Sequence, residues 1–377
     1  MTYGELMTDQ RFPAEVYAER LAGVAAHAER AGVDAVIVGP GPDLEYLTGS
    51  RASTFERLTA LVIPSVGASW VVVPRLELAA LRASAVGELG IETRDWVDGQ
   101  DAYGLALQGV ADDATVAVSD SVPALHLIPL ADRLRSFPRL ATPILRTLRM
   151  VKDDAEIDAL RRAGAAIDRV HARVPQWLVA GRTERDVAAD ITAAILEEGH
   201  TEAAFVIVGS GPNGADPHHE VSDRVITDGD VVVVDIGGPV APGYNSDSTR
   251  TYCVGEPDAS VAERIAVLER AQQAAVDAVA PGVTAHQIDA AARDVLAAAG
   301  YGENFIHRTG HGIGLSVHEE PYIVAGSDEP LLQGMAFSVE PGIYFTGEWG
   351  ARIEDIVVVT ADGCEPMNTR PHGLTRV

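Results

Sequence analysis

The sequence predicts an α+β protein in which a smaller α/β domain, residues 1–147, precedes a larger domain, residues 148–377, that contains a pseudo-twofold repeat. Three observations support this fold class. The chain has 377 residues, which suggests two domains at roughly 100–200 residues each. Short apolar strands alternate with helical segments in the first part, as they do in α/β domains. The second part repeats one succession of helix, turn and strand.

The composition excludes several classes of partner. Apolar residues make up 47% of the chain, and 29 Lys and Arg stand against 55 Asp and Glu, giving a formal net charge of −26. Nucleic acids and anionic membranes bind through basic patches, so we expect neither as a partner. Two cysteines, Cys253 and Cys364, are too few for a disulfide framework or a multi-cysteine zinc site. The chain shows no signal-peptide core and no apolar run of ~18–20 residues, so we expect a cytoplasmic protein.

The first domain begins with a helix. Residues 13–31 carry helical periodicity, and Gly32 is suited to end the helix. Val16, Leu21, Val24 and Ala25 fall on one face of this predicted helix. Beyond it, we expect strands over 35–39, 69–74 and 115–119 and helices around 76–88 and 122–134. Segment 141–154 is the predicted junction, and a long helix is expected to start at Asp153.

An internal repeat organises the second domain. Thr183 begins one predicted helix and Gly199 ends it, and Thr284 and Gly300 do the same for another. The distance from Thr to Gly is sixteen positions in both copies. Gln287 stands where a capping box requires it. A phenylalanine and then a histidine follow each helix: Phe205 and His218, then Phe305 and His318.

The repeat also predicts that two acids face one cleft. Gly229 leads an apolar run with Asp235 six positions later, and Gly334 leads another with Glu340 six positions later. Two tandem α+β half-domains would bring such equivalent strands together around a pseudo-twofold axis. Asp235 and Glu340 would then approach each other although they are distant in the sequence.

Further candidate ligands stand near these acids. Asp247 follows Asp235 by twelve residues, Glu354 follows Glu340 by fourteen, and His311 lies in a glycine-rich segment, HRTGHGIGLSVHEEP. A buried carboxylate must be paired or must bind metal. Four carboxylates in one cleft repel each other unless cations neutralise them, and two divalent ions held by bridging carboxylates would do so.

Each of these residues also has a plainer interpretation when it is taken alone. A single histidine is usually a surface or core residue, Asp235 could simply end a strand, and Arg352 and Glu354 could form a structural ion pair. The segment GSGPNG (209–214) fits a dinucleotide-binding pattern, but that motif needs a helix directly after the glycines. Here ADPHHEVSD follows, with Pro217 and no apolar periodicity, so we reject a Rossmann site.

Five segments together resemble the pita-bread metallopeptidases, the family of prolidase, aminopeptidase P and methionine aminopeptidase. They are VVVDIGG, YNSDSTRTY, GHGIGLSVHEEP, SVEPGIY and ARIEDIVVV. The resemblance covers about 150–377, with a weaker likeness of 1–147 to the creatinase/prolidase N-terminal domain. It is especially strong to mycobacterial-type cytoplasmic dipeptidases. The implied activity is hydrolysis of Xaa-Pro bonds in small peptides, by a dipeptidase or an aminopeptidase P-like enzyme.

The resemblance also implies a ligand set and a mechanism. Asp247 and Glu354 would bridge two metal ions, Asp235 would complete one site, and His311 and Glu340 would complete the other. A hydroxide shared by the metals would attack the scissile carbonyl, and Glu340 would carry its proton to the leaving amine. The oxygen-rich ligand set suits Mn²⁺, with Co²⁺, Zn²⁺ or Fe²⁺ as possible substitutes.

The resemblance also implies roles for residues that surround the metal ligands. His218 and His318 resemble the two histidines that hold the substrate carbonyl in the family. Arg352 resembles a residue that orients a metal carboxylate, and Tyr344 matches an active-site tyrosine. The chain departs from many prolidases at Tyr322, where they place an arginine that grips the dipeptide carboxylate. Arg308 is the candidate replacement.

Two alternatives to the peptidase remain open at this point. The same fold supports creatinase-like C–N hydrolysis without metals, and some relatives are catalytically silent binding proteins. The complete ligand set argues against both. A homodimer is expected from the resemblance alone.

Overall fold

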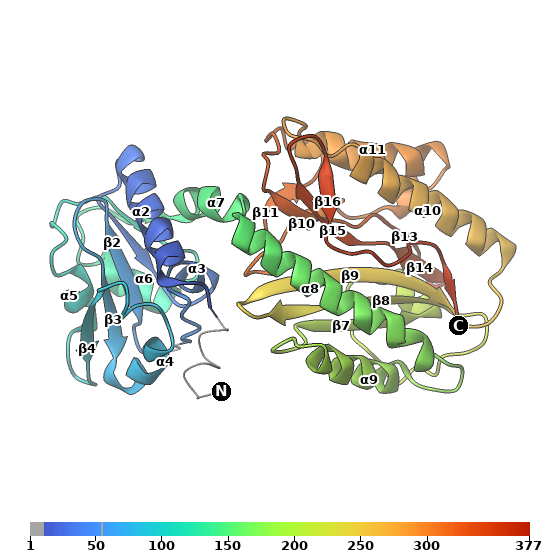
Figure 1. The fold of residues 1–377 in the computed structure, drawn as a ribbon, viewed down its shortest axis with the longest axis horizontal. Coiled ribbons are helices and arrows are strands. Elements are labelled where there is room, and N and C mark those ends of the chain that lie inside the picture. Colours follow the sequence, from blue (N-terminus) through green and yellow to red (C-terminus); the bar gives the residue numbers. More distant parts are fainter. Residues whose placement is uncertain (1–10, 54–55) are drawn as a thin grey trace. The chain divides into compact units, whose positions relative to one another are not determined.

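The computed structural model describes residues 11–53 and 56–377 and divides the chain into two compact units, Met1–Arg149 and Met150–Val377 (Figure 1). The first unit has its own apolar core, and the second has two further core clusters. The predicted α+β class is confirmed. In the part of the chain that the structure describes, no helix is long and apolar enough to cross a membrane.

The first unit is built on a six-stranded mixed sheet with strand order β4-β3-β2-β1-β5-β6. The strands are β1 Ala35–Val38, β2 Ala60–Pro64, β3 Trp70–Pro74, β4 Glu92–Trp96, β5 Val116–Val118 and β6 Arg139–Leu140. Three of them, β1, β3 and β5, match the predicted strands. Strand β4 has the sequence ETRDW and sits at a sheet edge, where polar residues do not give an apolar signal.

Helices and a short 3₁₀ turn precede, connect and follow these strands. They are α2 Ala14–Arg30, α3 Pro42–Thr48, η1 Arg75–Glu77, α4 Leu78–Arg82, α5 Ala102–Leu107, α6 Ala124–Ala131 and α7 Thr142–Met150.

The helix predicted over residues 13–31 is α2, and its apolar face is only in part the face that is buried. The helix buries Tyr17, Arg20, Val24 and Ala28, whereas three of the four residues on the predicted apolar face are only partly buried. Arg20 points inward, and its guanidinium carbon lies 4.1 Å from the centre of the Tyr46 ring. This cation–π contact stabilises a charged side chain on the buried face of the helix.

The second unit consists of two halves, each with helices and strands. The first half contains α8 Asp154–Arg173, η2 Val174–Gln176, α9 Glu184–Glu197, β7 Phe205–Ser210, η3 Gly211–Ala215, β8 Val231–Val240 and β9 Tyr244–Cys253. The second half contains α10 Ala259–Asp277, α11 Ala285–Ala298, η4 Gly302–Asn304, β10 Gly310–Gly312, β11 Glu319–Ile323, β12 Ala336–Val339, β13 Gly342–Phe345, β14 Trp349–Arg352, β15 Asp355–Val359, β16 Cys364–Pro366 and β17 Thr375–Arg376.

The predicted repeat is present in the structure. Helices α9 and α11 both start with a complete capping box, at Thr183 and Thr284. Gly199 and Gly300, just beyond the helix ends, have φ of +97° and +87°, which glycine adopts without strain. In Figure 1, the strands lie between α9 and the pair α10 and α11.

The strands of the second unit form three sheets. One has the order β17-β9-β8-β7, another β11-β10-β12-β15-β16, and β13 pairs with β14. An isolated bridge between Thr249 of β9 and Glu354, just before β15, connects the first two sheets. The Glu354 backbone N–H donates to the Thr249 carbonyl at 3.2 Å. This bridge joins the two halves of the repeat at the position of a predicted ligand.

Candidate metal centre

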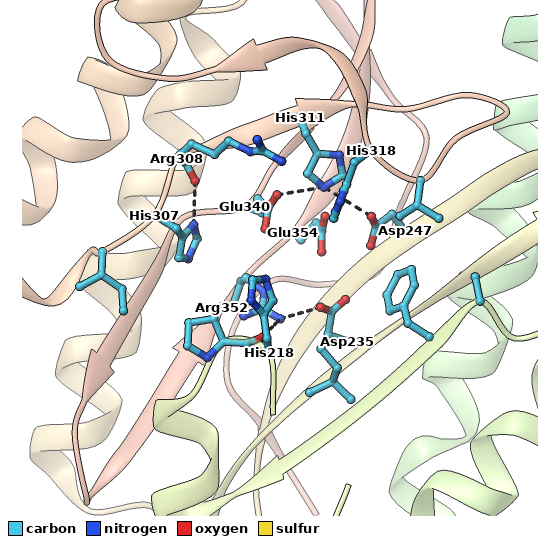
Figure 2. A pocket seen from close by; sticks show the side chains of 16 residues that line it. His218, Asp235, Asp247, His307, Arg308, His311, His318, Glu340, Arg352 and Glu354 are labelled. Atoms are coloured by element: carbon cyan, nitrogen blue, oxygen red, sulfur yellow. Dashed lines mark hydrogen bonds and ion pairs between the residues drawn. The ribbon is translucent and has the colours of Figure 1, made fainter. Parts of the chain in front are cut away.

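A cavity of about 930 Å³ lies in the second unit and collects most of the predicted site residues (Figure 2). Its apolar wall includes Phe205, Ile207 and Ile306. Its charged and polar lining consists of His218, Asp235, Asp247, His307, Arg308, His311, His318, Glu340, Arg352 and Glu354. All five predicted metal ligands are among these residues.

The register of β8 and β9 explains the positions of the first two acids. Asp235 pairs with Thr249, and Asp247 pairs with Gly237, in one antiparallel ladder. Directly opposed residues share a face of a sheet, and so do residues two apart along a strand. Asp235, Asp247 and Thr249 therefore point to the same side, although twelve positions separate the two acids.

The glycine at position 310 lets β10 lie close to β12, which brings His311 near Glu340. A Cβ on Gly310 would lie 1.8 Å from the Ser338 carbonyl oxygen, so only glycine permits this contact between β10 and β12. The Ser338 hydroxyl accepts the His311 backbone N–H at 3.0 Å and donates to Glu340 Oε1 at 3.0 Å. His311 Nε2 then lies 3.1 Å from Glu340 Oε1.

Glu354 lies at the bridge between the two sheets and is the last member of the ligand cluster. Its side chain is buried, and Oε2 accepts the Thr249 hydroxyl at 2.7 Å. One ligand atom from each of Asp247, His311 and Glu354 lies within 4.8 Å of the other two. His311 Nε2 is also 3.7 Å from Asp247 Oδ2. Carboxylates from both halves of the repeat thus surround one imidazole.

A buried chain of hydrogen bonds fixes Asp235. Arg352 donates from Nη2 to Asp235 Oδ2 at 2.6 Å and from Nη1 to the Tyr344 hydroxyl at 2.8 Å. The His307 Nδ1 atom lies 2.7 Å from the Arg308 carbonyl, which can only accept, so Nδ1 carries the proton. His307 Nε2 then accepts the Tyr344 O–H at 2.9 Å. Arg352 thus donates in two directions: to Asp235 on one side, and to Tyr344 on the other, from which the donors continue through His307 to the Arg308 carbonyl.

The sequence analysis did not identify His307. Burial lowers its pKa, which keeps the imidazole neutral and suited to accept from Tyr344. The available signal was its position four residues before His311, within HRTGHG.

The two histidines of the repeat both line the cavity. Figure 2 shows His318 beside His311 and His218 beside Arg352. The ring centres of His311 and His318 are 4.1 Å apart in an edge-to-face arrangement. Burial and the neighbouring His311 lower the pKa of His318 to about 4, so its imidazole is neutral near pH 7 and offers one N–H.

Comparisons with known proteins agree with this geometry. The model of metallopeptidase family M24 matches residues 158–361, more than half of the chain. The chain belongs to metallopeptidase family M24. The model of the creatinase/prolidase N-terminal domain matches residues 20–151.

Individual relatives of the chain belong to the same family. It is 66% identical over 370 residues to a probable dipeptidase PepE of Mycobacterium bovis, covering 98% of each chain. It is 36% identical to an Xaa-Pro dipeptidase of Lactobacillus helveticus, covering 85% of this chain and 88% of the relative. A crystal structure of dipeptidase PepE from Mycobacterium ulcerans superposes with a TM-score of 0.94 at 65% identity, covering 97% of this chain and 99% of the other.

Membership of family M24 implies divalent metal ions, and the donor set of this chain fits them. Burial raises the pKa of Asp247 well above its ordinary value, and the charge of Asp235 adds to the effect. Burial together with the Asp247 charge raises the pKa of Glu354 in the same way. Cations would remove this repulsion. Without them, the buried carboxylates favour protonation.

Two further atoms are suited to metal coordination. Asp235 Oδ1 is buried and receives no hydrogen bond from any residue that the structure describes. His311 Nδ1 donates to the Gly312 carbonyl at 3.1 Å, so Nε2 presents its lone pair toward Glu340 unless a proton or metal occupies it. A metal-bound histidine typically donates its other ring N–H to a backbone carbonyl in this manner.

The remaining predicted residues lie farther out. Tyr344 reaches Asp235 only through Arg352. Tyr322 is 39% exposed and is absent from the cavity lining, whereas Arg308 lines the cavity. The Arg308 guanidinium carbon lies 4.4 Å from the centre of the Tyr322 ring. Tyr322 therefore stacks on Arg308, the candidate cation for a substrate carboxylate.

Proposed function

We propose that this family M24 metallopeptidase is a dinuclear exopeptidase that hydrolyses Xaa-Pro bonds in small peptides. One observation carries the proposal: four carboxylates, three buried and that of Glu340 partly buried, line a single cavity with one imidazole, and one oxygen of Asp235 accepts no hydrogen bond from the described residues. The printed names of the relatives, dipeptidase and Xaa-Pro dipeptidase, support the substrate class.

The positions of the five ligands support an assignment of each ligand to one or both of two metal ions. Asp247 and Glu354 lie between the others and would bridge two ions. Asp235 would complete the site next to Arg352, whereas His311 and Glu340 would complete the other site (Figure 2). When bound, two divalent cations would lower the pKa of water and polarise the scissile carbonyl. The single imidazole among oxygen donors favours Mn²⁺.

Protein groups would move the proton and stabilise the developing charge. Glu340, held by the Ser338 hydroxyl, would take a proton from the attacking water and pass it to the leaving amine. His318 is neutral near pH 7 and would donate its N–H to the carbonyl oxygen as negative charge develops there. His218, at the other side of the ligand cluster in Figure 2, would hold the substrate carbonyl in place.

Arg308 supports dipeptides as the preferred substrates. Two arginines line the cavity, and Arg352 is buried against Asp235. Arg308 stacks on Tyr322 and would pair with the free carboxylate of an Xaa-Pro dipeptide. A homodimer is part of the proposal by family resemblance, and light scattering on the purified protein tests it.

A substrate panel with metal analysis tests the proposed function. The metal-stripped enzyme is reconstituted with Mn²⁺, Co²⁺, Zn²⁺ or Fe²⁺ and assayed on Gly-Pro-type dipeptides and Xaa-Pro-Yaa tripeptides. We expect two ions per chain and metal-dependent cleavage of the dipeptides. Preference for tripeptides would replace the dipeptidase assignment with an aminopeptidase P-like one. Metal-free turnover of a C–N substrate, or no turnover with bound metal, would favour the creatinase-like or silent alternative.

A further inference from the structure

A buried acid outside the metal cluster occupies the first position of α9. Glu184 is fully buried, with an exposed fraction of 0%. The repeat-equivalent position in α11 is Ala285, which is also fully buried. Both helices carry complete capping boxes. Alanine is therefore sufficient at this position for the helix start. The carboxylate of Glu184 in the first half must be explained by contacts other than those of the helix start.

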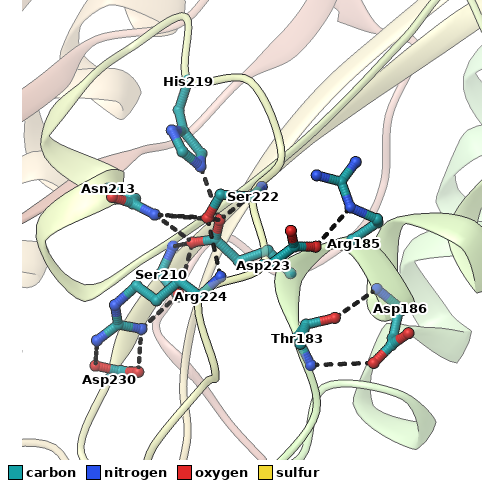
Figure 3. Close-up of polar contacts among 11 residues, drawn as sticks. Thr183, Arg185, Asp186, Ser210, Asn213, His219, Ser222, Asp223, Arg224 and Asp230 are labelled. Carbon is teal, nitrogen blue, oxygen red and sulfur yellow. Dashed lines mark hydrogen bonds and ion pairs between the residues drawn. The ribbon is translucent and has the colours of Figure 1, made fainter.

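Donors surround both oxygens of this carboxylate (Figure 3). Oε1 accepts the Ser210 N–H at 2.8 Å, the Ser210 hydroxyl at 2.7 Å and the Asn213 amide at 3.0 Å. Oε2 accepts the Ser222 N–H at 3.1 Å, the Ser222 hydroxyl at 2.6 Å and His219 Nε2 at 2.8 Å. All these donors belong to residues 210–222, the segment that carries His218 to the cavity.

The hydrogen bonds to Glu184 involve residues on both sides of His218 in the chain. Its neighbour His219 turns its ring to Glu184, while His218 lines the cavity. The His218 N–H donates to Asp216 Oδ1 at 3.0 Å, and the His219 N–H donates to the Asp216 carbonyl at 3.2 Å. Asn213 precedes this turn and also reaches Glu184. One buried anion thus anchors the backbone before and after His218.

The arrangement requires a carboxylate rather than an amide. Arg224 donates to the Ser210 hydroxyl oxygen at 2.6 Å, which leaves the Ser210 hydrogen for Glu184. Both Glu184 oxygens therefore face donors only. Burial raises the Glu184 pKa, but hydrogen bonds from Ser222 and Ser210 outweigh it and set the pKa at about 2. Glutamine would turn an NH₂ group toward N–H and O–H donors, leaving buried donors unpaired.

We propose that Glu184 is a positioning residue for His218: it anchors segment 210–222 so that the His218 imidazole faces the substrate carbonyl. The proposal rests on the function assigned to His218 in Xaa-Pro hydrolysis. Glu184 itself does not line the cavity. Its contribution to turnover should therefore depend on the presence of His218.

A double-mutant cycle on the metal-loaded enzyme tests this dependence. Glu184→Gln alone should lower kcat by about tenfold to a hundredfold, because a displacement near 1 Å can cost that much. KM and bound metal should stay near wild type. In a His218→Ala background, the same change should alter kcat by less than about twofold. Asp223→Asn is the control, because its exposed carboxylate pairs with Arg185 at the surface, and it should keep wild-type kcat.

Several outcomes would overturn the proposal. Equal losses of kcat from Glu184→Gln with and without His218 would show a general structural role. Unchanged kcat in Glu184→Gln would show no role in turnover. If Glu184→Gln does not fold, His219→Ala removes one anchoring donor and should show the same dependence on His218. Independent losses in that cycle would refute the positioning role.

A crystal structure separates this proposal from the function on which it rests. If His218→Ala retains full kcat, the catalytic assignment of His218 fails, whatever Glu184 does. The Glu184→Gln structure should still show segment 210–222 displaced, with the His218 ring turned from its wild-type position. An unchanged His218 ring in that structure would refute the positioning proposal itself.

Discussion

Replacing Arg352 by lysine tests how the protein orients its metal ligands. The guanidinium donates to Thr249 Oγ1 at 3.2 Å, to the Tyr344 hydroxyl at 2.8 Å and to Asp235 Oδ2 at 2.6 Å. An ammonium group keeps the charge but cannot reproduce this fork. If lysine keeps the contact with Asp235, two hydrogen bonds from the charged guanidinium to hydroxyl groups are lost. At about 1.5–3 kcal/mol each, Arg352→Lys should lower the free energy of unfolding by about 3–6 kcal/mol.

The same substitution should also weaken metal binding. Loss of a residue that orients a ligand typically costs about tenfold to a hundredfold in metal affinity. We expect that range for Mn²⁺, measured by competition with a chelating dye, alongside denaturant unfolding of the metal-free protein. Arg94→Lys is the matched control, because the Arg94 guanidinium makes a comparable set of contacts within the first unit, with Glu92 at 2.8 Å and with the carbonyls of Leu105 at 3.2 Å and Gln108 at 2.7 Å. It should lose stability and keep metal affinity. Wild-type metal affinity in Arg352→Lys would refute the reasoning.

Three further predictions concern catalysis, specificity and pH. His318→Ala should keep both metals and lose about 10²–10³ in kcat, measured by steady-state kinetics with metal analysis; unchanged kcat would contradict its role. Arg308→Met should raise KM for Gly-Pro but not for its C-terminal amide; equal KM changes would exclude carboxylate recognition. The fall in the Glu184 pKa from 4.5 to about 2 corresponds to about 3 kcal/mol of stability. Because the folded pKa is depressed, this stabilisation is present above pH 4.5 and is lost as pH falls toward 2. The difference in unfolding free energy between wild type and Glu184→Gln should shrink over that range, and a constant difference would contradict it.

The sequence predicted the repeat because its signals are local. Thr183 and Thr284 mark helix starts through side-chain bonds to residues three positions away. Near Asp235 and Glu340, the signal is an apolar run led by a glycine six positions before the acid, which marks two equivalent strands. These patterns were enough to bring the acids into one cleft in the prediction, as the structure of the second unit has them.

Other features depend on contacts that no local pattern encodes. His307 matters through Tyr344, thirty-seven positions away, and a lone histidine carries no sign of that partner. In the sequence, Glu184 is an ordinary acid at a helix N-terminus, where acids are common. In the structure, its carboxylate accepts six short hydrogen bonds from residues 210–222, which come later in the chain. Arg20 was not assigned to the buried face of α2, because the prediction sought aliphatic side chains.

Anomalous diffraction at the manganese edge, from crystals grown with Mn²⁺, tests the central claim most directly. We expect two peaks in the cavity about 3.5–4 Å apart, both within bonding distance of Asp247 and Glu354. One should also contact Asp235, and the other should contact His311 and Glu340. A cavity without anomalous density, or ions bound away from these five side chains, would contradict the dinuclear assignment.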